Sequence, residues 1–369
     1  MNGYQETLTI KLKVLGPAFV GSGRELSKKE YVFLNKSEIG VLDFPKFYNY
    51  IVSKGLSDRF ETFLVNDERG ELYKWLYNYK IRIDDIKQYF KYIMPCGDTS
   101  LTKGNKTQIM EFVKDPYGIP YIPGSSMKGA LRNMLLNDNI SDNRTSFNTF
   151  KNNVKYTLDN NYNKRNRKIL SREDKELNVK VFNKLEREQK KIDDARNDEL
   201  AGLIVGDSKP LEISNLILVQ KIERGTDGTE RSLNLMREAI KPGTLVEFPL
   251  TIDTKLCTID KEKIMHSVKA FSQVYNECFV RKFKGFGDIK EDIMYLGGGS
   301  GFASKTVNYT LFGSEEGTEI NRAIFDNTGV PSNHKHNLDI HKGVSPHIMK
   351  CTRWDGKLYQ MGKCRISVE

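Results

Sequence analysis

The segment 121–136, YIPGSSMKGALRNMLL, contains residue types that can hold a phosphate group. Pro123 and Gly124 predict an extended segment and a tight turn, because proline disfavours helix in the residue before it and glycine tolerates a positive φ. Ser125 or Ser126 can then cap a helix through its hydroxyl. The apolar residues of that helix recur at the spacing of one buried stripe: Met127, Ala130, Leu131, Met134 and Leu135.

The opposite side of the same helix carries polar and small residues, which are Ser125, Lys128, Gly129 and Arg132. Backbone N–H groups at a helix start, the positive end of the helix dipole and flanking cations all favour a bound anion. The segment therefore predicts a phosphate-binding helix start. An ordinary capped amphipathic helix with solvated Lys and Arg side chains fits the same residues.

A second tract of this kind is the segment 295–306, YLGGGSGFASKT. Its loop residues are Gly297, Gly298, Gly299, Ser300 and Gly301, and Ser304, Lys305 and Thr306 follow where a helix can begin. Main-chain N–H groups of such a loop can surround phosphates, with Lys305 as a point charge. The loop does not match GxxxxGK[ST] and is not a Walker loop. A tight structural turn is the alternative.

A third, shorter tract is Gly21-Ser22-Gly23, which follows a predicted strand. Its glycines let the backbone approach a ligand closely, although any sharp turn uses them too.

Strands and helices that position these tracts follow from the spacing of apolar residues. We expect strands or hairpins at 8–14, 31–42, 108–122, 203–208, 216–222 and 244–252, with a closing strand pair at 358–368. Asp43 and Asp260 can each cap a helix, and 57–94 predicts helices whose aromatic residues lie in the core. The segment 137–200 resembles an insertion, and its basic cluster 164–168 is a solvated face or a nucleic-acid contact.

Two rounds of strands and helices predict an α+β protein with two sandwiches of sheet and helix and a boundary near 226–231. The chain has 369 residues and a formal net charge of +10, which favours an anionic partner, with nucleic acid first. The start of the chain lacks a signal-peptide pattern, and no apolar run is long enough to cross a bilayer. We therefore expect a cytoplasmic protein with no membrane partner.

Metal and disulfide chemistry have little support in the sequence. The five cysteines are scattered without paired spacing, which argues against disulfides and a thiolate zinc site. Four of the five histidines crowd 334–347, a segment that we interpret as a polar loop in preference to a metal site.

Several motifs together resemble the RAMP superfamily, in the order in which its members carry them: LGPAFVGSG, IPGSSMKGALR, VGDSKP, LILVQK, YLGGGSGFASKT and YQMGKCRISV. Within the superfamily, the chain is most similar to the fifth subunits of Csm complexes, the type III-A CRISPR effectors. The resemblance implies two ferredoxin-like, RRM-related domains, which we set at 1–226, with helical insertions near 57–95 and 137–200, and at 227–369.

The resemblance also implies a function and partners. It implies a non-catalytic subunit that binds CRISPR RNA, caps the filament of backbone subunits at the 3′ part of the guide and supports guide maturation and antiviral defence. The other Csm backbone subunits are the implied protein partners. The small helical subunit, target RNA and a trimming nuclease are further candidates, and no cofactor or metal is implied.

Residues of the matching motifs are the candidate RNA-binding residues. They either contact RNA or shape the contacting loops, and they are Gly21, Ser22, Gly23, Ser125, Ser126, Lys128, Gly129, Arg132, Gly297, Gly298, Gly299, Ser300, Gly301, Ser304 and Lys305. Main-chain donors and cations bind sugar and phosphate without reading bases, as a protein that accepts many guide sequences requires.

Two enzymatic readings compete with RNA binding alone. Relatives often carry His where this chain has Phe19, and because Phe19 cannot transfer a proton, the departure weakens a repeat-processing endoribonuclease. Asp98, Asp115 and Asp207 are acidic candidates for such an enzyme, but turns and caps explain them more simply. A nucleotide-dependent enzyme is disfavoured by the missing Walker spacing.

Overall fold

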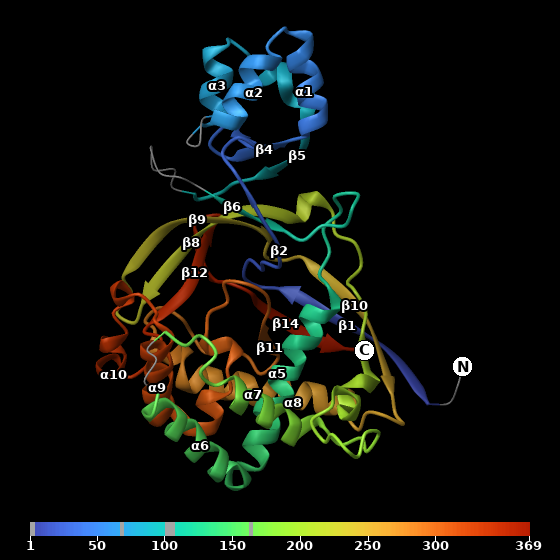
Figure 1. Ribbon diagram of the computed structural model, residues 1–369, viewed down its shortest axis with the longest axis vertical. Coiled ribbons are helices and arrows are strands. Elements are labelled where there is room, and N and C mark those ends of the chain that lie inside the picture. Colours follow the sequence, from blue (N-terminus) through green and yellow to red (C-terminus); the bar gives the residue numbers. More distant parts are fainter. Residues whose placement is uncertain (1–3, 67–69, 100–107, 162–164) are drawn as a thin grey trace.

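The computed structural model describes residues 4–66, 70–99, 108–161 and 165–369. Two sheets form the centre of the molecule (Figure 1). The five-stranded sheet is antiparallel and has the order β11 (Ile293–Tyr295), β14 (Lys363–Val368), β1 (Gln5–Val14), β10 (Leu245–Asp253) and β7 (Leu203–Val205). The six-stranded sheet has the order β13 (Lys357–Gln360), β12 (Ile348–Trp354), β8 (Leu216–Gly225), β9 (Glu230–Ile240), β6 (Ile109–Phe112) and β2 (Gly21–Leu26).

A small helical subdomain projects from one end of the molecule (Figure 1). It contains a three-stranded sheet and four helices: β3 (Tyr31–Phe33), β4 (Glu38–Leu42), β5 (Phe90–Pro95), α1 (Phe44–Ser53), α2 (Ser57–Asn66), α3 (Leu72–Asn78) and α4 (Ile83–Ile86). Aromatic residues fill its separate core, where the rings of Phe60 and Trp75 lie 4.9 Å apart. The predicted hairpin at 31–42 and the Asp43 cap are confirmed. Phe60, Phe63 and Trp75 lie in the core as predicted, but Tyr73 and Tyr77 are exposed.

The remaining helices lie below the sheets in the view of Figure 1. They are α5 (Gly124–Asp142), α6 (Asn148–Asp159), α7 (Ser171–Phe182), α8 (Lys261–Cys278), α9 (Asn308–Thr328) and α10 (Asp339–Lys342). Helices α5 and α8 pack against each other and against strands of the five-stranded sheet, and α9 packs beside them. Asp260 caps α8 by accepting a hydrogen bond from the Lys263 N–H (2.7 Å), as predicted.

The buried stripe of α5 is confirmed, but its predicted serine cap is wrong. Met127, Leu131, Met134 and Leu135 are buried, and Ala130 is partly buried against the same core. The helix begins at Gly124 and no side chain caps it in the usual way.

The reason lies in the chain that passes the start of α5. A Cβ atom at Gly124 would lie 2.2 Å from the carbonyl oxygen of Val205, so only glycine permits this approach. The Gly124 N–H donates instead to Oδ1 of Asp207 at 2.8 Å. A carboxylate of the protein therefore occupies the position at the helix start where we expected an external anion.

The α+β class with ferredoxin-like sheets is confirmed, but the sheets do not divide at residue 226. That residue falls in the turn between β8 and β9, which pair with each other. Strand β1 lies between β10 and β14, so the five-stranded sheet needs residues from both sides of the predicted boundary. One continuous hydrophobic core joins the two large sheets. The small subdomain has a separate hydrophobic core.

The closing strands also differ from the prediction. Strand β13 pairs with β12 and strand β14 pairs with β1 and β11, so the two belong to different sheets. The inward positions of Cys364, Ile366 and Val368 are confirmed.

All five cysteines are buried and free. Within the described residues, no helix has the length and apolar character needed to cross a bilayer.

Candidate nucleic-acid interface

The three tracts singled out in the sequence meet at one cavity of about 360 Å³, which we call the glycine cleft. Its lining residues are Val20, Gly21, Ser126, Gly129, Ala130, Asn133, Met134, Tyr295, Leu296, Gly297, Gly298, Ser304 and Lys305. Strand β2, helix α5 and the loop after β11 thus each contribute to one concave surface.

Backbone contacts hold the glycine-rich loop against the N-terminal tract. The Gly298 N–H donates to the carbonyl oxygen of Phe19 at 2.6 Å. A Cβ atom at Gly297 would lie 2.1 Å from that oxygen, and one at Gly298 would lie 2.9 Å from the Phe19 ring. Gly297 also has φ of 81°, which favours glycine. Glycine is therefore required here for close docking of two segments distant in sequence.

At Gly129 the backbone of helix α5 is exposed to the glycine cleft. In the described part of the chain, no atom outside the helix's own nearby backbone and Gly129's two neighbours lies within 4 Å of the position that a Cβ would take there. Ser126 lines the cleft beside it, while Ser125 is exposed outside the lining. The absence of a side chain at Gly129 lets a ligand approach the helix backbone.

The two cations of α5 have internal partners. Lys128 Nζ donates to the carbonyl oxygen of Leu200 at 2.6 Å, and burial lowers the pKa of Lys128. Arg132 binds Asp198 at 2.6 Å and Asn178 at 2.7 Å. The two side chains therefore tie α5 to the 178–200 part of the insertion, which we did not anticipate from the sequence.

The serine hydroxyls of the glycine-rich loop also act within the protein. Ser300 Oγ donates to the carbonyl of Gly297 at 3.0 Å, and Ser304 Oγ lies 3.2 Å from the carbonyls of both Ser300 and Gly301. Both serines are buried. Both hydroxyls shape the loop, and of the two serines only Ser304 lines the cleft, together with the loop glycines Gly297 and Gly298 and with Lys305.

Gly21, Ser22 and Gly23 form an irregular start of the edge strand β2. The register between β2 and β6 shifts between Gly21 and Glu25. Gly23 is open and has φ of 87°, and the Ser22 hydroxyl accepts a hydrogen bond from the Arg24 N–H at 3.1 Å. Of the three residues only Gly21 lines the glycine cleft.

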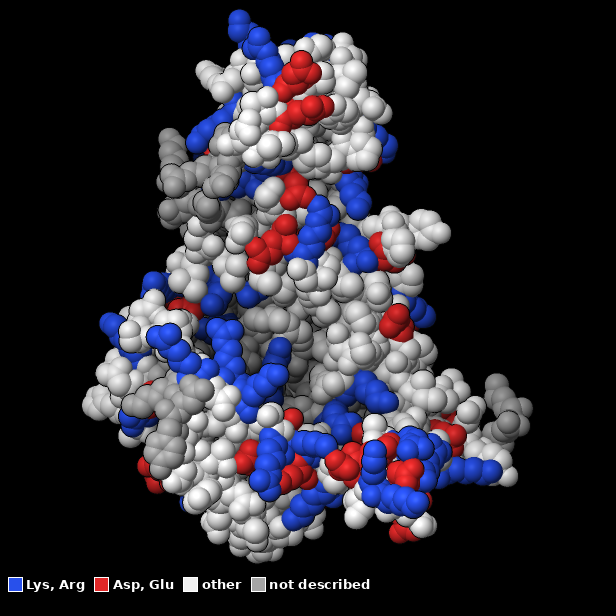
Figure 2. Space-filling view, in the orientation of Figure 1, with Lys and Arg blue, Asp and Glu red and all other residues white. Residues whose placement is uncertain are grey.

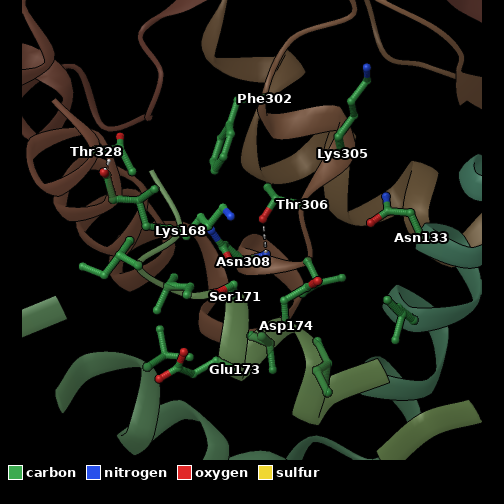
Figure 3. A pocket seen from close by; sticks show the side chains of 18 of the residues that line it. Asn133, Lys168, Ser171, Glu173, Asp174, Phe302, Lys305, Thr306, Asn308 and Thr328 are labelled. Carbon is green, nitrogen blue, oxygen red and sulfur yellow. Dashed lines mark hydrogen bonds between the residues drawn. The ribbon is translucent and has the colours of Figure 1, made fainter. Parts of the chain in front are cut away.

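A second cavity of about 360 Å³ adjoins the glycine cleft and shares Asn133 and Lys305 with it. It lies between the insertion and the start of α9, and Arg167 and Lys168 of the predicted basic cluster line it. Lys168 lies beside Asn308 in this cavity, whereas the Lys305 side chain points away from the other labelled residues (Figure 3). Lys164 of the basic cluster lies outside the described residues.

Several cations lie around the groove that the glycine cleft and the second cavity form together, which we call the combined groove. Within the described residues, Lys305 and Lys168 take part in no ion pair. Partial burial and, second, the nearby guanidinium of Arg237 lower the pKa of Lys305. Figure 2 shows Lys and Arg side chains gathered around the hollow in the middle of this face. An anion bound there would favour the charged form of Lys305 and Lys168, which make no ion pair within the described residues.

Arg237 is a site residue that the sequence analysis missed. It lies on β9 with its guanidinium 5.5 Å from the centre of the Phe19 ring, and a Cβ at Gly299 would lie 3.1 Å from its terminal nitrogen. Its Nε is buried and has no hydrogen-bond partner among the residues that the structure describes, and burial lowers the pKa of Arg237. The sequence offered only one signal for Arg237, an arginine among the apolar residues of a strand. That signal is weak unless the position of the glycine-rich loop over the strand is known.

The three acidic candidates for catalysis serve turns and caps, as the simpler interpretation predicted. Asp98 accepts a hydrogen bond from the Gly356 N–H at 2.8 Å. Asp115 accepts from two N–H groups of its own turn, and Asp207 accepts from the N–H at the start of α5. Neither cluster of metal-ligating side chains found within the described residues contains any of the three.

Fold and site define an α+β protein with a concave, basic, glycine-lined surface between its sheets and helices. The model of the RAMP superfamily matches residues 11–337, and the chain belongs to this superfamily. The resemblance inferred from the motifs is thereby confirmed.

Individual relatives and solved structures agree with this assignment. The chain is 29% identical over 322 residues to the "CRISPR system Cms protein Csm5" of Streptococcus thermophilus, covering 83% of this chain and 81% of that protein. It is 26% identical over 399 residues to the protein of the same name from Mycobacterium tuberculosis (strain CDC 1551 / Oshkosh), and the match covers 100% of this chain and 99% of that protein.

Two solved structures share the fold. A chain in the cryo-EM structure of a type III-A Csm-crRNA-target RNA ternary complex has a TM-score of 0.64 and 18% identity, covering 98% of this chain and 100% of that one. The crystal structure of T. onnurineus Csm5 has a TM-score of 0.64 and 19% identity, and the match covers 96% of this chain and 99% of that one.

Proposed function

We propose that this chain is a non-catalytic subunit of a type III-A Csm complex that binds CRISPR RNA. In this role it caps the filament of backbone subunits at the 3′ part of the guide and supports guide maturation and antiviral defence in the cytoplasm. Support comes from its RAMP membership, from relatives named Csm5 and from the likeness of its fold to a chain of a Csm-crRNA-target RNA complex.

The observation that carries the proposal is the meeting of three distant tracts at the glycine cleft. Gly129 leaves the helix backbone open to the cleft, while Gly21 and Gly297 let the N-terminal tract and the glycine-rich loop pack closely around Phe19, so that an extended polyanion can reach the backbone. Lys305 and Lys168 supply positive charge and take part in no ion pair within the described residues, although Glu173 and Asp174 also line the adjoining cavity. Such a surface binds sugar and phosphate in any sequence context, which suits a subunit that must accept many guides.

The candidate residues divide into two groups under this proposal. Contacts to RNA come from the cleft-lining residues Gly21, Ser126, Gly129, Gly297, Gly298 and Lys305, with Arg237, Arg167 and Lys168 beside them. The remaining candidates shape or support the loops: Ser22, Gly23, Ser125, Lys128, Arg132, Gly299, Ser300, Gly301 and Ser304.

A role without bond cleavage fits the chemistry of the groove. Phe19, at the position where relatives often have His, is buried with its ring beneath the glycine-rich loop. Asp98, Asp115 and Asp207 each accept backbone hydrogen bonds away from any shared cluster. Metal-free RNA cleavage needs an acid and a base close to one phosphate, and none of these residues supplies such a pair.

Co-expression with the other Csm subunits and a CRISPR RNA, followed by size-exclusion chromatography, tests the proposal. We expect the chain to co-elute with the complex and with RNA, and end-labelled repeat RNA to stay intact on incubation with the purified chain. A wild-type chain that fails to join the particle would contradict the assignment. Specific cleavage products that disappear in an Asp98→Ala, Asp207→Ala variant would instead support the endoribonuclease.

A further inference from the structure

Two histidines and one aspartate converge at the end of α9, away from the glycine cleft. His336 lies in the turn before α10, Asp339 begins α10, and His347 directly precedes β12. Nδ1 of His336 lies 2.9 Å from Oδ2 of Asp339, and Nδ1 of His347 contacts Oδ1. One ligand atom of each residue lies within 4.8 Å of the other two. The segment that we interpreted as a polar loop therefore gathers three potential metal ligands.

We propose that His336, Asp339 and His347 bind a divalent transition-metal ion of the Zn²⁺ type. Imidazole and carboxylate are preferred Zn²⁺ ligands, and three protein ligands leave a fourth position for water. Ligand atoms around a tetrahedral Zn²⁺ lie about 3.3 Å apart, given bonds of about 2.0 Å. Small side-chain movements bring the three atoms from their present separation to that distance.

Neighbouring groups hold the three ligands in position before an ion arrives. The His336 ring stacks on Phe325, with ring centres 4.1 Å apart. Ser345 Oγ donates to Oδ2 of Asp339 at 2.5 Å, and the backbone N–H of His347 donates to Oδ1 at 3.2 Å. Such outer hydrogen bonds orient ligands and strengthen metal binding.

A metal ion can reach the three ligands, and both histidines can adopt the tautomer that binds it. Asp339 is fully buried, but the side chains of His336 and His347 are 11% and 12% exposed, so an ion can enter between them. Without an ion, each Nδ1–H can donate to the carboxylate. Metal binding requires the lone pair of Nδ1, so each neutral imidazole then carries its proton on Nε2.

The other metal-like cluster within the described residues is different. It contains Asp138, Asp142 and His266, but Lys263 Nζ lies 2.7 Å from Oδ2 of Asp138 and 3.2 Å from Asp142. An ammonium group already neutralises these carboxylates. Within the described residues, no Lys or Arg side chain pairs with Asp339.

Metal binding would cross-link the segment around α10 to the start of β12. This proposal does not depend on RNA binding, because none of the three ligands lines the glycine cleft or the adjoining cavity.

The test uses full-length protein with any affinity tag removed and bound metal stripped with EDTA. Titration with Zn²⁺ against a chromophoric chelator should show one site with a Kd below about 1 µM. A His336→Gln, His347→Gln variant keeps amide donors for Asp339 but loses both imidazoles, and it should bind Zn²⁺ at least about tenfold more weakly. His341→Ala, on exposed α10 outside the cluster, is the matched control and should bind like the wild type.

Wild-type protein without a Zn²⁺ site of this affinity, or a double variant that binds as tightly as the wild type, would overturn the proposal. X-ray absorption of Zn²⁺-loaded wild type provides a readout that does not depend on folding of the variant. It should report nitrogen and oxygen ligands at about 2.0 Å. Sulfur ligands would place the ion elsewhere and would also overturn the proposal.

Discussion

Replacing Lys305 and Lys168 together with glutamine should weaken RNA binding in a strongly salt-dependent way. Both side chains border the groove, and neither has an acidic partner within the described residues, so their charges are available to phosphates. Each cation that contacts a phosphate of single-stranded RNA releases about 0.7 counterion. The slope of log K against log salt should therefore fall by about 1.4 in the double variant.

The affinity change follows from the same relation. At 0.15 M salt each lost contact removes about 0.6 log unit of affinity, so the double variant should bind roughly fifteenfold more weakly. At 0.5 M salt the deficit should shrink to about threefold, because each released counterion gains less entropy when the bulk salt concentration is higher.

Fluorescence anisotropy with a labelled CRISPR RNA over a series of salt concentrations measures both quantities. The control is Lys46→Gln, Lys74→Gln, which removes equal charge from exposed ion pairs of the projecting subdomain. We expect the control to retain the wild-type slope. Equal slopes for wild type and the groove variant, or an equal loss of slope in the control, would refute the assignment of the groove.

Four further substitutions test the architecture around the groove. Gly297→Ala places Cβ against a carbonyl of the N-terminal tract, so thermal denaturation should show a loss of at least about 2 kcal/mol. Gly129→Ala meets no atom, so it should raise stability by up to about 1 kcal/mol yet weaken RNA binding by narrowing the cleft; unchanged binding would contradict this. Arg132→Ala frees the 178–200 segment, and limited proteolysis should cut there first, whereas an unaltered digestion pattern would count against the tether. Glu238→Ala leaves buried Lys114 with only its longer ion pair to Glu111 (3.6 Å), and urea denaturation should show a loss of about 3 kcal/mol, in contrast to a surface substitution.

Local patterns in the sequence were sufficient for much of the fold. The apolar stripe of α5 and the aspartate caps at Asp43 and Asp260 depend on residues a few positions apart, so spacing alone predicts them. Family motifs also identified the three tracts that meet at the glycine cleft.

Features set by distant contacts were not predictable in this way. The start of α5 depends on Asp207, and the roles of Lys128 and Arg132 depend on the insertion that covers them. Arg237 becomes a site residue only because the glycine-rich loop folds over β9. None of these contacts leaves a periodic signal near the residue concerned.

The most direct test of the central claim is photocrosslinking of an assembled particle that carries 4-thiouridine-substituted CRISPR RNA, with the adducts mapped by mass spectrometry. We expect adducts on this chain to concentrate in peptides from the glycine cleft and the adjoining cavity, around 19–24, 124–133, 165–171 and 295–306. Adducts confined to the projecting subdomain or to the outer strands, with none in these four segments, would contradict it.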